Sequence, residues 1–214
     1  TGKGTVYLWT PGRKTYTLEQ LCSDLRQDTS ENIFYKLEQI LCCVEELVGC
    51  IRILHQAGLV MQDIKPSNIG YFMRGDRVRE QMISLFDFDS VCNMNDINAP
   101  LLRVGTDGFT EPQTNIPCDC RTDIYSIGAI LFYALTGHIY HVDSFDTIPE
   151  LLKGSVFLSK LNLRTKKHTE LLNSLCNILQ SCLAAQREDR YLNCENLASD
   201  LATVTELCHT LRPR

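Results

Sequence analysis

The sequence has no apolar run long enough to cross a membrane and no visible signal peptide. It also lacks an excess of positive charge, since 21 Lys and Arg stand against 26 Asp and Glu and give a formal net charge of -5. Because no basic patch dominates, nucleic acid is not an expected partner. Internal repeats and low-complexity segments are missing as well. The 214 residues, 44% of them hydrophobic, are therefore expected to form one globular body that does not enter a membrane.

Despite its eleven cysteines, the sequence contains no C-x-x-C motif. Cys118 and Cys120 come nearest to one, but their spacing is one residue short of a zinc-binding pair. Most of the other cysteines lie among apolar residues at helical spacing. We therefore expect buried, reduced thiols in an intracellular, cytoplasmic protein, rather than zinc ligands or disulfides.

Most of the secondary structure that the sequence predicts is helical. Apolar residues three and four positions apart predict a long helix over Asn32–Ala57, which Gly58 ends. The stretch Thr122–Gly137 is apolar on all sides, which is typical of a helix buried in the core. Further helices are predicted after a threonine cap at Thr17 and over 148–153, 169–183 and 193–211.

Strand patterns are short and few. Two apolar runs, Ile69–Met73 and Met82–Phe86, flank the turn sequence Arg74-Gly75-Asp76-Arg77 and predict a β-hairpin. A further short strand is predicted over Thr5–Trp9. The predicted fold class is therefore mainly α, with α+β character from a small hairpin.

Polar residues with a defined spacing lie between the long helix and the hairpin. Asp63, Lys65 and Asn68 form the pattern D-x-K-x-x-N, and Asp87 begins a D-F-D sequence directly after the hairpin. These stretches resemble the catalytic loop and the metal-binding motif of eukaryotic-type protein kinases, H-R-D-x-x-x-x-N and D-F-G. A loop of ordinary polar residues would explain the first pattern alone. It does not explain why Gly105-Thr106 and then Asp123 follow in the order found in that family.

The resemblance implies phosphoryl transfer from ATP to a serine or threonine of a protein. Asp63 would accept the proton of the attacking hydroxyl, Lys65 would neutralise the transferring phosphate, and Thr106 would hydrogen-bond to both. Asn68 and Asp87 offer oxygen ligands, which Mg²⁺ prefers. The implied cofactors are ATP and Mg²⁺, and the implied partner is a protein substrate or a regulatory protein.

The adenine of ATP is expected to contact the hinge at Leu8, Trp9 and Thr10. Gly70 stands where kinases usually place an apolar residue beneath the adenine. Phe86 is unusually large for its position, and we expect its ring to fill the space that Gly70 leaves. The alternative is a degraded nucleotide site.

The resemblance covers nearly the whole chain, but only the large lobe of a kinase. Residues 1–12 would be the end of a small-lobe strand and the hinge, and residues 17–214 would be the large lobe. The glycine-rich loop, the strand lysine and its partner glutamate have no counterpart here. The small lobe is therefore expected to precede Thr1 in the same, longer chain.

Several motif residues depart from the family pattern. Met61 and Gln62 replace the His-Arg pair, and Gln62 has no charge with which to bind a phosphate. Asp89 replaces the glycine of D-F-G. Gln113 replaces the glutamate of the A-P-E motif, so we expect a hydrogen bond instead of an ion pair with Arg190.

Three classes of function stay open at this point. Lys65 and Thr106 favour a serine/threonine protein kinase. The altered motif residues favour a pseudokinase, a nucleotide- or partner-binding regulatory scaffold without catalysis. A small-molecule kinase is a third class, because such enzymes often carry an acidic residue after the D-F pair, as Asp89 is here. The helix that begins near Asp123 resembles protein kinases more than small-molecule kinases, and we expect its carboxylate to accept backbone N–H groups near Met61.

Overall fold

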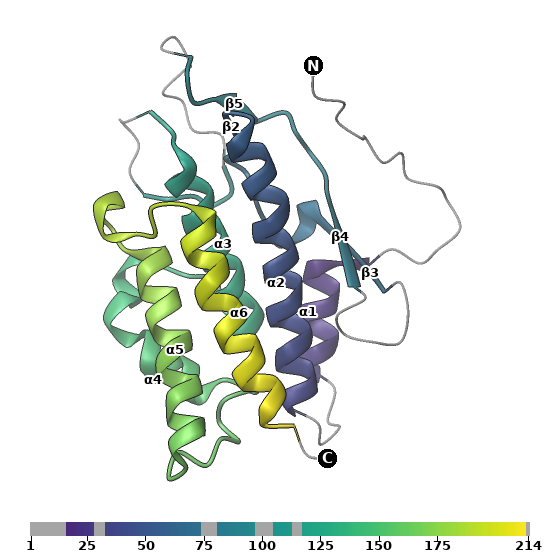
Figure 1. The fold of residues 1–214 in the computed structure, drawn as a ribbon, viewed down its shortest axis with the longest axis vertical. Helices are drawn as coiled ribbons and strands as arrows, with labels where there is room; N and C mark the ends of the chain where they lie inside the picture. Colours follow the sequence, from purple (N-terminus) through teal and green to yellow (C-terminus); the bar gives the residue numbers. More distant parts are fainter. Residues whose placement is uncertain (1–15, 28–32, 74–80, 97–104, 113–116, 213–214) are drawn as a thin grey trace.

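The structure, a computed structural model, describes residues 16–27, 33–73, 81–96, 105–112 and 117–212. Its α-helices are α1 (Leu18–Gln27), α2 (Ile33–Gln56), α3 (Cys120–Thr136), α4 (Ile148–Gly154), α5 (Lys166–Leu183) and α6 (Cys194–Thr210). Its strands are β1 (Tyr16–Thr17), β2 (Leu59–Val60), β3 (Ile69–Met73), β4 (Gln81–Leu85) and β5 (Cys92–Asn93). Three short 3₁₀ helices join them: η1 (Pro66–Asn68), η3 (Val142–Thr147) and η4 (Arg187–Asp189). The prediction of a mainly α fold with a small hairpin is confirmed (Figure 1).

Helices α2 and α3 form the centre of the molecule. Helix α2 packs against α3 and α6, and α3 packs against α5 as well (Figure 1). Helix α3 is buried on nearly all sides, as its apolar sequence predicts. A side chain added to Gly128 would collide with the Cβ atom of Cys182, so this glycine allows α3 to approach α5 closely.

The ends of α3 are fixed by local hydrogen bonds. Asp119 is the N-cap: its carboxylate accepts the N–H of Arg121, and its own N–H is accepted by the hydroxyl of Thr122 at 3.3 Å. Gly137 ends the helix with φ at 81°, a left-handed conformation that glycine adopts easily. This helix therefore presents Asp123, in its first turn, at a defined position.

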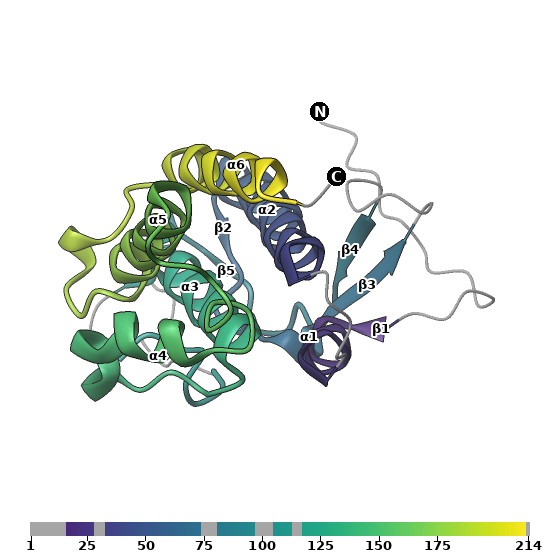
Figure 2. The ribbon, with the colours of Figure 1, turned by 90° about the horizontal axis from the view of Figure 1, so that it is seen from below.

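Two small antiparallel sheets flank the helices. Strand β3 lies between β1 and β4, with Thr17 opposite Gly70 and Ile69 opposite Leu85. Figure 2 shows this sheet on the side of the molecule away from α4 and α5. The sequence did not predict β1, because two residues are too few to show the alternation of a strand. Strand β2 pairs with β5, an element that the sequence also did not reveal.

The expectation of reduced cysteines is wrong for one pair, because the structure joins Cys92 and Cys118 by a disulfide. They lie 26 residues apart, in β5 and in the loop before α3. No pattern in the sequence pairs these two residues. The other nine cysteines form no disulfide in the structure, and seven of these are buried. Burial raises the pKa of the Cys22 and Cys194 thiols to about 12, so both stay protonated.

Two further observations concern the described residues alone. No helix there combines the length and the hydropathy that a transmembrane segment needs. No group of three or more His, Cys, Asp or Glu side chains there is arranged to hold a metal ion.

Candidate active site

The loop that carries Asp63 is held in place by Asp123 of helix α3. This carboxylate is fully buried, and it accepts the N–H of Met61 at 3.0 Å and the N–H of Gln62 at 2.9 Å. Gln62 has a φ of 66°, the left-handed conformation that residues other than glycine rarely adopt. The two hydrogen bonds from backbone to carboxylate maintain this turn, as expected from the sequence.

His55, near the end of α2, is a third partner of Asp123. Its Nε2 lies 2.8 Å from Asp123 Oδ2, and its Nδ1 lies 3.4 Å from the sulfur of Cys194. The sequence did not indicate these contacts, because the residues that contact His55 come from α3 and α6. With these contacts, every oxygen of Asp123 has a partner, which offsets the cost of burying the carboxylate.

Asp63, Lys65 and Thr106 form a closed set of hydrogen bonds. Lys65 Nζ lies 2.8 Å from Asp63 Oδ2 and 3.0 Å from Thr106 Oγ1. Thr106 donates both its N–H and its hydroxyl to Asp63 Oδ1, each at 3.0 Å. The exposed fraction is 11% for the Asp63 side chain and 23% for Lys65, so the set is accessible from one side. The structure thus brings together three of the residues that the sequence selected.

Asn68 and Asp87 lie next to this set. Asn68 Nδ2 is 3.4 Å from Asp87 Oδ2 and 3.4 Å from the backbone oxygen of Asp63. Asp87 is exposed and has a φ of 62°. A carboxylate and an amide oxygen fit Mg²⁺, which is typically bound by one or two carboxylates together with phosphate oxygens. For this role the Asn68 amide would turn its oxygen, and not its nitrogen, toward the metal.

Phe86 covers the backbone of Gly70, as predicted. A Cβ atom on Gly70 would lie 2.7 Å from Phe86 Cε2 and 2.8 Å from Cζ, closer than any real contact. The Phe86 side chain comes from the end of the hairpin, and the residue is 40% exposed. The ring therefore occupies the space that a side chain at position 70 would take, while part of the residue remains exposed.

Glu111 is the buried carboxylate at the end of the Gly105–Gln113 stretch. Arg190 Nη1 donates to its Oε2 at 2.6 Å, and Arg187 Nε donates to the same oxygen at 2.8 Å. Arg187 Nη2 also contacts Oε1, to which Thr122 donates its hydroxyl at 2.7 Å. The side chains of Glu111 and Arg190 are fully buried. We call Glu111, Thr122, Arg187 and Arg190 the buried ion-pair cluster.

This cluster gives Arg190 a partner that the sequence did not indicate. The sequence comparison with A-P-E placed the expected partner of Arg190 at Gln113, which lies outside the described residues, whereas Arg190 binds Glu111, two positions earlier. The sequence also missed Arg187, although its spacing of three residues from Arg190 puts both guanidinium groups within reach of one carboxylate. Glu111 therefore forms ion pairs with both arginines, and the predicted hydrogen bond of Gln113 stays a prediction.

The cluster lowers the pKa of Glu111. Burial alone would raise this pKa, but hydrogen bonds from Arg187, Thr122 and Arg190 outweigh burial and hold it at about 2, compared with an ordinary value of 4.5. Glu111 is therefore ionised in the folded protein at neutral pH. Arg187 Nη1 further donates to the backbone oxygen of Pro117 at 2.6 Å, which ties the cluster to the loop before α3.

Three of the predicted nucleotide contacts, Leu8, Trp9 and Thr10, lie outside the described residues. Of the other predicted site residues, the structure brings together Asp63, Lys65, Asn68, Asp87 and Thr106, and it places Gly70 and Phe86 at the neighbouring hairpin.

The chain belongs to the protein kinase domain family, whose model matches residues 6–201. A probable serine/threonine-protein kinase of Clostridium acetobutylicum is 27% identical over 187 residues, which cover 84% of this chain and 27% of the relative. Serine/threonine-protein kinase PknD of Chlamydia abortus is 24% identical over 226 residues, 92% of this chain and 23% of the relative. The calcium/calmodulin-dependent protein kinase type II of Caenorhabditis elegans is 26% identical over 117 residues, 54% of this chain and 16% of the relative. The chain thus spans about a quarter of the length of the first two relatives.

Proposed function

We propose that the full-length protein transfers a phosphoryl group from ATP to a serine or threonine of a protein substrate. The observation that carries this proposal is the hydrogen-bonded set of Asp63, Lys65 and Thr106, with Asn68 and Asp87 beside it. The serine/threonine kinases among the relatives support the same substrate class. We further propose that a small lobe in the same, longer chain covers the nucleotide.

Asp63 is the proposed acceptor of the substrate's hydroxyl proton. Among the described residues, its Oδ1 accepts two hydrogen bonds from Thr106, whereas Oδ2 accepts one from Lys65. A carboxylate oxygen can accept two hydrogen bonds, so Oδ2 keeps a site for the incoming hydroxyl. Thr106 and Lys65 hold the carboxylate in one orientation, which is what a general base requires.

Lys65 has a second role in this proposal. Its ammonium group lies between Asp63 and Thr106 and is partly exposed, so it can turn one N–H toward the phosphoryl group as negative charge develops there. Bound Mg²⁺ would supply further charge neutralisation on the phosphates, and Asn68 and Asp87 are the residues that would hold it. The Phe86 ring, which is partly exposed, would support the adenine in place of a side chain at Gly70.

The test measures transfer of radiolabelled phosphate from ATP to a peptide library by the full-length protein. We expect incorporation into serine- or threonine-containing peptides with Mg²⁺, and loss of incorporation in Asp63→Asn. The matched control is Asp24→Asn, which removes an exposed carboxylate on α1 and should leave the rate unchanged.

Two outcomes would contradict the proposal. Stabilisation by ATP with Mg²⁺ but no transfer to any substrate would identify a pseudokinase, in which Gln62 and Asp89 mark the loss of catalysis. Transfer to small hydroxyl compounds but to no peptide would identify a small-molecule kinase.

A further inference from the structure

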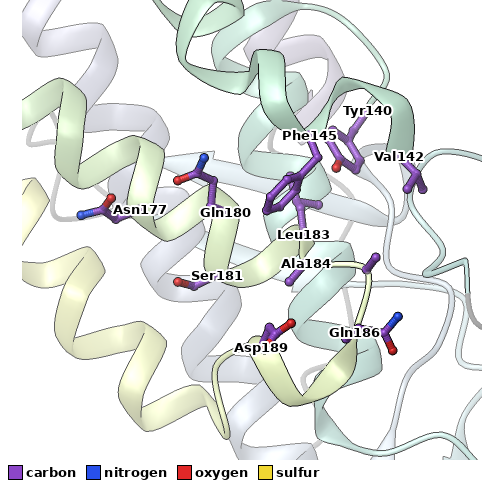
Figure 3. A pocket seen from close by; sticks show the side chains of 11 residues that line it. Tyr140, Val142, Phe145, Asn177, Gln180, Ser181, Leu183, Ala184, Gln186 and Asp189 are labelled. Atoms are coloured by element: carbon purple, nitrogen blue, oxygen red, sulfur yellow. The ribbon is translucent and has the colours of Figure 1, made fainter.

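A cavity of about 570 Å³ is lined by residues of three segments, which lie between Tyr140 and Asp189 in the sequence. It opens between η3, the C-terminal end of α5 and the segment that leads into η4 (Figure 3). Its volume is in the range of ligand-binding pockets, roughly 300–1,000 Å³. No residue of the proposed phosphoryl-transfer site lines it.

The inner wall of this cavity contains an unsatisfied hydroxyl group. Tyr140 is 1% exposed, and its hydroxyl has no hydrogen-bond partner among the described residues. The ring is held edge-on against Phe132 and Tyr125, at 5.4 and 6.2 Å between centroids. In Figure 3 the hydroxyl is turned inward, on the side of Leu183, and away from Val142. A buried hydroxyl without a partner is costly, so a ligand that accepts its hydrogen bond would be favoured.

Burial raises the pKa of Tyr140 to about 12, an effect that exceeds the opposite influence of Arg190. The hydroxyl is therefore neutral at physiological pH and acts as a donor. An acceptor such as a carbonyl oxygen is the group that fits it.

The outer wall of the cavity is lined by carboxamides and one carboxylate. Asn177 and Gln180 lie three residues apart on α5, with Ser181 beside them, so they follow one face of the helix. Gln186 and Asp189 line the opposite side. In the described part of the chain no Lys, Arg or His lines the cavity, so an anionic ligand would find no countercharge.

The character of these groups matches a polypeptide. Each carboxamide both donates and accepts, as do the N–H and C=O groups of an extended backbone. Val142 and Phe145 add apolar surface at the mouth, where a side chain could enter. Asp189 and the net charge of -5 favour a basic residue nearby.

We propose that this cavity binds an extended segment of a partner protein that carries an apolar anchor residue followed by a lysine or arginine. A backbone carbonyl of the segment accepts the hydrogen bond of the Tyr140 hydroxyl. The anchor side chain packs between Val142 and Phe145, and the basic residue pairs with Asp189. This binding requires no nucleotide and no phosphoryl transfer, so its test is independent of the proposed function.

The probe is a set of fluorescein-labelled octapeptides with Leu or Phe at one position and Lys or norleucine two positions later, titrated with the protein by fluorescence anisotropy. We expect at least one Lys-containing peptide to bind with a Kd below 1 mM, which sets the threshold of detection at about -4 kcal/mol. Tyr140→Phe should weaken binding by about tenfold, the size expected for one lost neutral hydrogen bond. Because that hydroxyl has no partner among the residues that the structure describes, the Tm of this variant should be equal or higher.

The matched control is Tyr191→Phe. Its hydroxyl donates to Asp200 at 2.6 Å and lies outside the cavity, so this variant should lower the Tm and leave peptide binding unchanged. Asp189→Asn should remove the preference for Lys over norleucine. Val142 is exposed, so Val142→Arg should abolish peptide binding without unfolding the protein. If Tyr140→Phe folds poorly, Val142→Arg takes its place as the test.

Equal affinity of the wild type, Tyr140→Phe and Val142→Arg would overturn the proposal. So would the absence of binding by every peptide in the set. Binding of small aromatic amines at this cavity, with no binding of peptides, would show that it takes a small molecule and would overturn it too.

Discussion

The buried ion-pair cluster and the Asp63 set use similar groups in different surroundings. In the cluster, the side chains of Glu111 and Arg190 are fully buried, and every charge is matched within the protein. In the Asp63 set, 23% of the Lys65 side chain remains exposed, and Asp63 Oδ2 can accept a further hydrogen bond. Groups of the same kind are therefore closed to solvent in the buried ion-pair cluster and accessible from one side in the Asp63 set.

This difference should appear in the free energy of unfolding, and the largest effect is expected for Glu111→Ala. The substitution leaves two buried guanidinium groups without their carboxylate, which typically costs about 3–5 kcal/mol. Urea unfolding measures it, with Glu111→Gln as the variant that keeps the shape. A loss below about 1 kcal/mol, the value of an exposed pair, would remove the contrast between the two regions.

The buried ion-pair cluster should also determine how the free energy of unfolding changes at acidic pH. Because the pKa of Glu111 falls from 4.5 to about 2 on folding, its carboxylate stabilises the protein above pH 4.5, and this stability is lost as the pH falls toward 2. The difference corresponds to about 3 kcal/mol. The free energy of unfolding of the wild type should therefore decline more steeply across this window than that of Glu111→Gln. Parallel curves would show that another carboxylate governs acid unfolding.

A smaller effect is expected where Phe86 meets Gly70. Gly70→Ala places a methyl group against the ring, and overpacking costs about 1–3 kcal/mol; since Phe86 is half-exposed and can move, we expect about 1. Gly70→Ala combined with Phe86→Leu should recover most of this loss. A double-mutant cycle of unfolding free energies checks the coupling, and additive losses would show that the two residues do not compete for the same space.

The smallest effect on stability is expected for Asp63→Asn. The pair with Lys65 is partly exposed and is worth at most about 1 kcal/mol, so thermal unfolding should change little. The activity of the full-length protein should nevertheless fall by about 10²–10⁴, the usual contribution of a general base. A large loss of stability in this variant would mean that the Asp63 set serves the fold as the buried cluster does.

The features predicted correctly from the sequence are those that depend on residues close together in the chain. The helices were predicted well because their apolar residues repeat within a few positions, as in α2 and α3. The loop residues Asp63, Lys65 and Asn68 were selected because their spacing is short and specific.

What the sequence missed depends on contacts between distant residues. Arg187 reaches Glu111 from 76 positions away, and His55 reaches Cys194 across 139. The Cys92–Cys118 disulfide likewise joins residues that are 26 positions apart. No local pattern encodes such pairings, and the same holds for the cavity beside Tyr140, which three separate segments line.

Asp123 binds the main chain of the catalytic loop and not its side chains. Every residue except proline has a main-chain N–H, so these two hydrogen bonds do not depend on which side chains stand at positions 61 and 62. The one restriction is the left-handed conformation at position 62, which disfavours β-branched residues. The placement of Asp63 is therefore independent of the side chains of Met61 and Gln62. A chain that carries glutamine where the H-R-D motif has arginine can hold the following aspartate in the same position.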